Sequence, residues 1–368
     1  MGFLMNNKQT KASLAADLNS IFKDMPSELI NQEGYLRLSA LTQMLPSEFS
    51  NFWGLECRLN TDEPLADILF EIKNNTSSQK LLAGYKPSSL DILCANYNAW
   101  HKIRAFANHW AEEQSILNEH ILNLWLEFDT EQLTSHKFAK DLLQKPSIFL
   151  GLRSRELSES GCTQILYHAN SLLLIPDLLL DNLQSFISHI PSPGQLFQLG
   201  SMLGRTSRDL RVCVNRLPFD VVPDWLLDIG WKGDNQALSV VLNKLAPLLR
   251  ASAIDLNLTE HGPSEKIGIE CYMGWDDVGL EQWELFLDTI QEFVLCSPAK
   301  RTGLLQYPGE VLLPAMSRRT TDGTLCFSLF KRIHHIKLGF DNGHVTDAKA
   351  YLSIHKPSMQ TNNDWLIE

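Results

Sequence analysis

The sequence predicts an α+β fold in which nine to ten antiparallel strands close into a barrel with a polar lumen, ringed by helices. Nine segments alternate apolar and polar residues with the period of two that is typical of strands with one buried face. Segments with helical spacing lie between them, so that tandem αββ units follow one another. A sheet of this many antiparallel strands rarely stays open without curling, and closure leaves no exposed edge.

Composition and charge limit the class of protein. Of the 368 residues, 44% are hydrophobic and 20% are charged, which is enough material for a core. The formal net charge of −11 argues against a nucleic-acid partner, because proteins that bind nucleic acids are usually basic. No run of about 18 uncharged apolar residues occurs, so we expect no membrane span. The seven cysteines are scattered without a CxxC motif, which predicts reduced thiols and a cytoplasmic location.

Three regions divide the chain. Residues 1–48 are predicted to be a helical N-terminal lead-in, with breaks at Pro26 and Pro46. Residues 49–356 hold all the strand segments and are expected to form the barrel domain, and residues 357–368 form a C-terminal tail. The length alone allows two domains, but barrels of this size are often a single domain.

The strand segments follow in order along the barrel domain. Gly262–Pro263 and Asn342–Gly343 separate neighbouring segments and are typical turn dipeptides, so they predict two antiparallel hairpins. The third αββ unit shows one strand segment only, and its second strand is not visible in the sequence. The segments are 53–60, 67–73, 123–129, 147–153, 210–217, 253–260, 266–273, 335–341 and 348–355.

Helices are predicted between the strand pairs. In the last of them Trp283, Phe286, Leu287 and Ile290 recur at helical spacing and would form one apolar face. The helical stretches are 90–114, 163–204 with a break near Pro191–Pro193, 236–250 and 280–295.

The two faces of the strand segments differ in character. One face is apolar, as Leu55, Cys57 and Leu59 show for the first segment, and it suits packing against helices. The other face mixes charged and aromatic residues, and this mixture is typical of a ligand cavity. In an open sheet with helices on one side, the polar face would meet bulk water, whereas in a barrel it would line a wet lumen. The mixture therefore favours the barrel.

Familiar chemical motifs are missing. The sequence has no dinucleotide-binding, P-loop, HExxH or GxSxG pattern. His334 and His335 begin a strand segment, but no carboxylate or cysteine stands at ligand spacing from them. We therefore interpret them as a histidine pair without a metal, and we predict no metal ligand set.

Basic and aromatic residues of the polar faces form the candidate site. Several cations that converge with tyrosine hydroxyls would bind an anion, most naturally a diphosphate. Aromatic rings around a carbocation would stabilise it by cation–π attraction. The alternative interpretation is a solvated, charged face. The basic residues are Arg58, Arg153, Arg211, Lys337 and Lys349, and other members of the polar faces are Glu56, Trp125, Glu270, Tyr272 and Tyr351.

These features resemble the aromatic prenyltransferases of the ABBA (PT-barrel) fold over about residues 50–356. Lys349-Ala-Tyr351 matches the K-x-Y pattern of that family, and Glu270-Cys-Tyr272 lies where a further shielding tyrosine would be expected. The first strand pair, WGLECRLN…ADILFEIKN, is similar to the first hairpin of the fungal indole and cyanobactin peptide members. In those members the first strand carries a catalytic glutamate, and Glu56 takes that place.

The resemblance implies a prenyltransferase that moves an isoprenoid group from its diphosphate to an electron-rich acceptor, either an aromatic small molecule or a peptide side chain. Glu56 would orient the acceptor and take its proton. The five basic residues would hold the diphosphate, while Trp125, Tyr272 and Tyr351 would shield the allyl cation and Glu270 would contribute to substrate binding. Mg²⁺ would assist through the diphosphate, without a dedicated carboxylate cage. The alternative is a non-catalytic peptide- or ligand-binding accessory protein on a barrel or an open-sheet α+β fold.

Overall fold

The computed structural model describes residues 14–46, 48–130, 146–153, 159–173, 175–202, 209–274, 279–293, 296–313, 318–320, 323–325 and 327–356. The predicted C-terminal tail, 357–368, lies outside the described residues, as do the first thirteen residues of the predicted lead-in.

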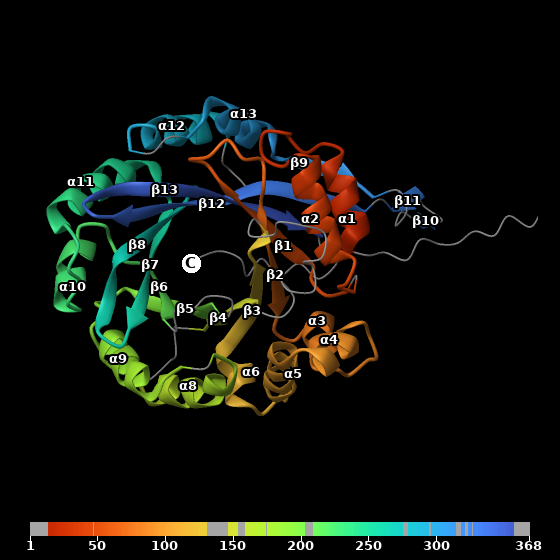
Figure 1. Ribbon diagram of the computed structural model, residues 1–368, viewed down its shortest axis with the longest axis horizontal. Helices are drawn as coiled ribbons and strands as arrows, with labels where there is room; N and C mark the ends of the chain where they lie inside the picture. The colour runs from red at the N-terminus through yellow and green to blue at the C-terminus, as the bar shows by residue number, and fades with distance from the viewer. Residues whose placement is uncertain are drawn as a thin grey trace, which may run out of the picture.

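Ten strands close into one antiparallel barrel, as the sequence predicts (Figure 1). Each strand pairs with the next one along the ring, and β13 pairs with both β12 and β1, which closes the barrel. The barrel strands are β1 (Phe52–Arg58), β2 (Asp67–Lys73), β3 (Ile121–Phe128), β4 (Ser147–Leu152), β5 (Gln195–Met202), β6 (Leu210–Asn215), β7 (Ala251–Thr259), β8 (Gly262–Tyr272), β12 (Ser328–Asp341) and β13 (His344–His355).

Helices surround the barrel on its outside and precede each strand pair, which gives five αββ units in the described part of the chain (Figure 1). The predicted helical stretch 90–114 divides into two helices. The helices are α1 (Leu14–Phe22), α2 (Gln32–Thr42), α3 (Ser77–Leu82), α4 (Leu90–Asn96), α5 (Asn98–Trp110), α6 (Ile116–His120), α8 (Glu159–Leu173), α9 (Asp177–Ser188), α10 (Val222–Asp228), α11 (Asn235–Leu245), the 3₁₀ turn η3 (Ala246–Leu248), α12 (Leu280–Ile290) and α13 (Pro298–Gln306).

The expectation that helix continues to residue 204 is wrong, because the strand missing from the third unit is β5, Gln195–Met202. Its sequence, QLFQLGSM, contains glutamines, a glycine and a serine, and its register shifts between Leu196 and Gln198. A bulge of this kind inserts one residue and breaks the alternation by which strands are recognised. Tertiary pairing with β4 and β6 makes the strand.

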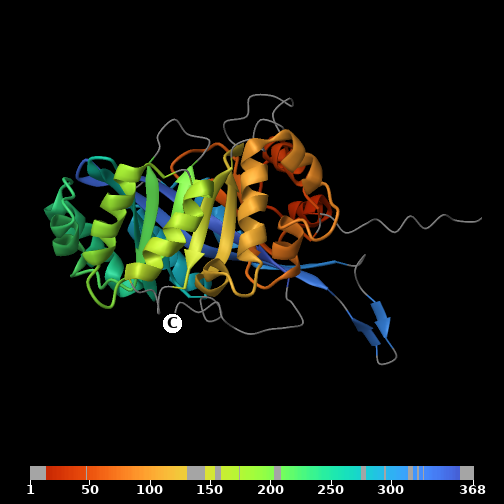
Figure 2. The ribbon, with the colours of Figure 1, turned by 90° about the horizontal axis from the view of Figure 1, so that it is seen from below.

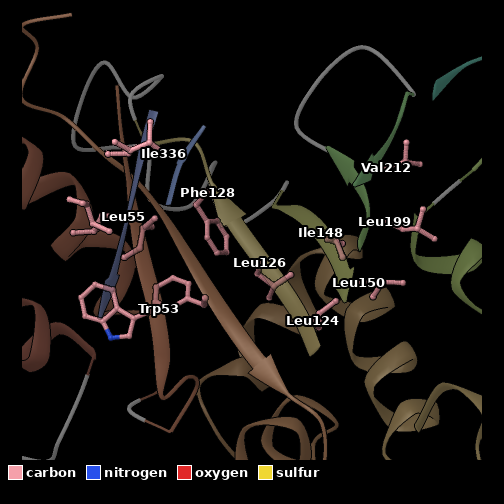
Figure 3. Packing of buried hydrophobic residues seen from close by; sticks show 14 of the residues in the cluster. Trp53, Leu55, Leu124, Leu126, Phe128, Ile148, Leu150, Leu199, Val212 and Ile336 are labelled. Carbon is pink, nitrogen blue, oxygen red and sulfur yellow. The ribbon is translucent and has the colours of Figure 1, made fainter. Parts of the chain in front are cut away.

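The core lies between the barrel wall and the helices (Figure 3). Leu55 and Leu126 are fully buried there, together with the aromatic rings of Phe70 and Phe128. Burying each side chain of this size contributes roughly 1.5–3 kcal/mol to stability. The apolar face of the strands therefore faces outward, and the opposite face turns into the barrel.

Both predicted hairpins are present. Asn342 and Gly343 connect β12 to β13 with φ angles of 51° and 78°. These positive values match the type I′ turn, which suits the twist of the flanking strands and favours the Asn-Gly dipeptide. Gly262, at φ 104°, serves the β7–β8 connection.

The helical lead-in packs on the barrel rather than apart from it. Lys356, after β13, pairs with Asp17 of α1 at 2.5 Å, and Lys331 of β12 donates to the carbonyl oxygen of Asp24 at 3.1 Å. Beyond the ring, β9 (Gly309–Leu312) pairs with β12, and the hairpin of β10 (Arg318–Thr320) and β11 (Gly323–Leu325) projects away from the barrel (Figure 2). Among the described residues, no helix is long and apolar enough to cross a membrane.

Candidate functional site

A cavity of about 970 Å³ occupies the inside of the barrel, and every barrel strand contributes to its lining. Its size falls within the range typical of ligand sites. All ten residues that the sequence analysis selects line this one cavity: Glu56, Arg58, Trp125, Arg153, Arg211, Glu270, Tyr272, Lys337, Lys349 and Tyr351. Strand alternation carries them to a common interior although they are spread over nearly 300 residues of sequence.

Three cations lie at one level of the barrel wall, which we call the cation layer. Arg58 of β1 is the register partner of Lys349 of β13, and Lys349 is the partner of Lys337 of β12. The layer continues to Glu270 on β8, the register partner of Lys337. Neighbouring strands thus present three basic side chains side by side to the cavity.

Aromatic rings lie two residues further along the same strands, and we call this level the aromatic layer. Tyr351 of β13 is the register partner of His335 of β12, and their rings stack with centroids 4.2 Å apart. The ring of Tyr272 lies 4.8 Å from that of His335. Further along β1, Phe52 lies four residues before Glu56 and makes an edge-to-face contact with Trp125 of β3, with ring centroids 5.7 Å apart.

Glu56 belongs to the aromatic layer but pairs with the cation layer. It is the register partner of Tyr351, and its Oε1 accepts a hydrogen bond from Lys349 Nζ at 2.5 Å. Burial alone would raise the pKa of Glu56, but the charge of Lys349 and hydrogen bonds from Lys349 and Tyr351 outweigh it and lower the pKa to about 2. Glu56 is therefore a carboxylate with strong donors already bound to it.

Arg211 and Lys337 share a second carboxylate, Asp255 of β7, which is fully buried. Burial would raise the pKa of Asp255, but the charges of Arg211 and Lys337 hold it below its ordinary value. The pair between β12 and β7 reaches across β8, where Gly268 is the register partner of Asp255. A Cβ at Gly268 would clash with Asp255 Oδ2 and Lys337 Cε, so the absence of a side chain makes room for the ion pair.

Two carboxyl groups on β2 and β3 have no such partner. Within the described residues neither Glu71 nor Glu127 forms an ion pair, and Glu71 accepts a hydrogen bond from Asn123 Nδ2 at 2.6 Å. Burial raises the pKa of Glu71 to about 7, which the Asn123 hydrogen bond and the charge of Lys73 offset only in part. Burial and the nearby charge of Glu56 raise the pKa of Glu127 to about 8. At neutral pH Glu127 is therefore largely protonated, and Glu71 holds its proton about half of the time.

Glu270 is a third carboxyl group whose pKa is raised. Burial raises its pKa even though the charge of Lys337 opposes the shift. Its Oε2 accepts a hydrogen bond from the Tyr272 hydroxyl at 2.6 Å, which joins the cation layer to the aromatic layer.

Two of the predicted basic residues lie at the edge of the site. Arg153 follows β4 and its side chain is exposed. Arg58 has 38% of its side chain exposed and lies 3.8 Å from Asp67. Water therefore reaches both groups, whereas Arg211, Lys337 and Lys349 are about four-fifths covered.

Sequence reasoning missed several lining residues as site members. Glu71 and Glu127 lie in segments it identified, so alternation alone could have found them, whereas Phe52 precedes the predicted segment 53–60. Asp255 was visible on the polar face of its segment, but its shared pairing with two cations depends on which strands become neighbours. His334 and His335 were noticed as a pair, but nothing in the sequence indicates that both line the cavity.

Comparison with solved structures finds the same fold in known enzymes, whereas no protein-family model and no curated protein sequence matches this chain. The prenyltransferase PriB in its apo form is 11% identical, with a TM-score of 0.55 over 95% of this chain and 100% of PriB. PriB in a ternary complex with L-tryptophan and dimethylallyl thiolodiphosphate is 12% identical, again with a TM-score of 0.55 and the same coverage. The 5-dimethylallyltryptophan synthase from Streptomyces coelicolor is 13% identical with a TM-score of 0.49, over 93% of this chain and 98% of the synthase.

At this level of identity the likeness concerns the fold. It confirms the barrel of the ABBA prenyltransferases that the resemblance in sequence implies. Because one fold can carry unrelated functions, the activity has to be argued from the residues of the cavity.

Proposed function

We propose that this chain is a prenyltransferase that moves an isoprenoid group from its diphosphate to an electron-rich acceptor. One observation carries the proposal: the cation layer and the aromatic layer are adjacent on the same wall of one cavity inside the barrel. An isoprenoid diphosphate has the same order of parts, with a charged head directly joined to an apolar chain that becomes cationic when the head leaves. The two layers match the two parts.

In this proposal Lys337, Lys349 and Arg211 bind the diphosphate and stabilise its charge as the bond to the prenyl group breaks. Each of them is paired with Asp255 or Glu56 in the described structure. The pairs hold the cations in place before the donor arrives, and the diphosphate has to compete with these carboxylates. Arg58 and Arg153 contribute more weakly because solvent screens them.

The allyl cation would then lie against Tyr351, Tyr272 and Trp125. Their rings attract a cation through the negative charge of the π face. Burial raises the pKa of both tyrosine hydroxyls well above the ordinary value, so the rings stay neutral and cannot trap the cation as phenolates. Glu56, at the same level as Tyr351, would orient the acceptor.

We propose that Mg²⁺ enters with the diphosphate. Among the described residues no group of three or more histidine, cysteine, aspartate or glutamate side chains is arranged to hold a metal ion. Two of the lumen carboxylates, Glu56 and Asp255, already bind cations of the chain itself. Mg²⁺ readily binds substrate phosphates while keeping several waters. Titration of the donor with Mg²⁺ and with EDTA measures this contribution.

Donor binding is the decisive experiment. Isothermal titration of the full chain with dimethylallyl thiolodiphosphate should show binding that weakens as salt is raised, because the contacts are ionic. Lys349→Met should weaken it at least about tenfold, the loss of one charge-assisted contact. Lys244→Met is the matched control, because Lys244 is a half-exposed lysine outside the barrel that also pairs with a glutamate.

Turnover is tested with dimethylallyl diphosphate and a panel of acceptors that includes L-tryptophan and indole-containing peptides, with products identified by mass spectrometry. Absence of donor binding at low salt would contradict the proposal and leave the accessory-protein alternative.

A further inference from the structure

His334 and His335 both line the cavity because β12 carries a bulge at this point. The register between β12 and β13 shifts between Ile333 and His335, so that His334 is the extra residue of the bulge. Regular alternation would turn only one of two neighbouring residues inward. Bulges of this kind re-aim side chains and are common beside active sites.

The two imidazoles are joined to each other. Their Nδ1 atoms lie 2.6 Å apart, so one ring must donate its proton and the other must accept it. His335 is 8% exposed, and its Nε2 has no hydrogen-bond partner among the described residues. A buried polar atom that lacks a hydrogen-bond partner and faces a ligand cavity indicates that a group of the ligand forms the missing hydrogen bond.

The two carboxyl groups that flank His335, on β1 and β8, are occupied. The Glu56 carboxylate is held by Lys349 and Tyr351, and Glu270 is held by the hydroxyl of Tyr272. His335 lies between them, stacked on Tyr351 and beside Tyr272, in the aromatic layer where the allyl cation would meet the acceptor.

We propose that Nε2 of His335 accepts the proton that the acceptor loses, and that His334 carries this charge onward; the inference rests on the proposed prenyl transfer. The C–O bond of the donor breaks and the diphosphate leaves with the electron pair. An electron pair of the acceptor forms the new bond to the allyl carbon, and the proton on the attacked atom moves to Nε2. His335 then gives its Nδ1 proton to Nδ1 of His334, which becomes the imidazolium.

The surroundings keep His335 neutral before the reaction. Burial, followed by the charges of His334 and Lys337, holds its pKa well below the ordinary value, and burial lowers the pKa of His334 to about 4. The titratable groups that face it from neighbouring strands are Tyr351, Lys349, Tyr272, Glu270 and Glu56. A neutral imidazole is a weak base here, but a prenylated aromatic cation is a strong acid, so a well-placed lone pair suffices.

The kinetic test uses His335→Phe, which keeps a ring on Tyr351 and loses both nitrogens. With dimethylallyl diphosphate and L-tryptophan, product formation should fall about 10²–10⁴-fold while binding of dimethylallyl thiolodiphosphate stays within twofold. Ring-deuterated tryptophan should give a primary isotope effect in the variant and little in the wild type, because proton loss becomes slow. His101→Phe, on the exposed side of α5, is the control. Unchanged turnover, or equal loss of turnover and donor binding, would overturn the proposal.

A second measurement does not require an acceptor or a variant that turns over. The wild-type chain, labelled with ¹⁵N at its eleven histidines, reports the tautomer of each ring by NMR. The His335 signals are assigned by their loss in His335→Phe or, if that variant does not fold, in His335→Gln. The proposal requires a bare Nε2 and a proton on Nδ1 at pH 7. A proton on Nε2 would overturn it even if donor binding succeeds, whereas a failure of donor binding alone contradicts the prenyltransferase function.

Discussion

Two parts of the barrel wall carry the same kind of residue in opposite states. In the paired sector, Glu56 and Asp255 lie beside lysine and arginine and are carboxylates. In the unpaired sector, Glu71 and Glu127 on β2 and β3 have no ion pair among the described residues, and their pKa values rise to about 7 and 8. Burial acts on all four groups in the same direction, so the difference comes from the cations.

This difference indicates that the two sectors of the cavity bind different parts of the substrates. The paired sector holds cations that can bind an anion, whereas the unpaired sector offers carboxyl groups with raised pKa values that can donate hydrogen bonds when protonated. Trp125 is the register partner of Glu71, so the neutral sector also carries an aromatic ring. We expect the diphosphate on the first sector and the less charged parts of the substrates on the second.

Removing the shared carboxylate should have the largest effect. Asp255→Asn leaves Arg211 and Lys337 without their anion in a buried site, and breaking such a pair typically costs about 3–5 kcal/mol of unfolding free energy. Denaturant unfolding measures this loss. Added pyrophosphate should stabilise the variant more than the wild type, because it can replace the missing charge. If Asp255→Asn has the same unfolding free energy as the wild type, the ion pairs of Asp255 do not contribute to stability.

The pH dependence of stability tests the unpaired sector. Glu71 keeps its proton in the folded state up to about pH 7, whereas an unfolded glutamate loses it near its ordinary pKa of about 4.3. The folded state thus binds more protons between these values, so stability should fall as pH rises from about 5 to 8, by on the order of 3 kcal/mol for this group.

Glu71→Gln keeps an acceptor for Asn123 and should flatten the fall in melting temperature over that range, with a gain in stability at pH 8. Glu113→Gln, on the exposed surface, is the control and should leave the profile unchanged. A wild-type profile that rises over this range would contradict the neutral state of Glu71.

Gly268→Ala tests the contact between Lys337 and Asp255 without changing any charge. The new methyl group would push Lys337 away from Asp255, and crowding of this kind typically costs about 1–3 kcal/mol. Gly309→Ala is matched to it, because a Cβ at Gly309 meets no atom within 4 Å. Thermal unfolding of the two variants should differ, and donor affinity should change in Gly268→Ala alone. Equal melting temperatures would mean that the strands make room for the methyl group at position 268 without a loss of stability.

The smallest effect is expected outside the barrel. Lys244 and Glu292 form an ion pair at 2.6 Å, but both side chains are about half exposed. Pairs of this kind contribute about 0–1 kcal/mol, because water and salt screen them. Lys244→Met should therefore change the unfolding free energy by less than about 1 kcal/mol. A loss of unfolding free energy as large as that of Asp255→Asn would contradict the expectation that buried ion pairs contribute more than surface pairs.

The sequence predicts those barrel strands in which apolar and polar residues alternate regularly. The β12–β13 hairpin is the clearest case, because alternation and the Asn342–Gly343 turn agree. The strand β5 was hidden, because its glutamines, its glycine and its bulge erase the period of two. Helix α10, with Pro223 in its first turn, was also not predicted.

In the regular strands, the sequence alone shows which side chains enter the lumen, because residues two apart share a face whatever the partner strand. Which of these side chains meet depends on the tertiary structure. The contact of Lys337 with Asp255 depends on the register of three strands and on Gly268 between them, and the joined imidazoles of His334 and His335 depend on one bulge. Registers and bulges are fixed by closure of the whole barrel, so no single segment of sequence encodes them.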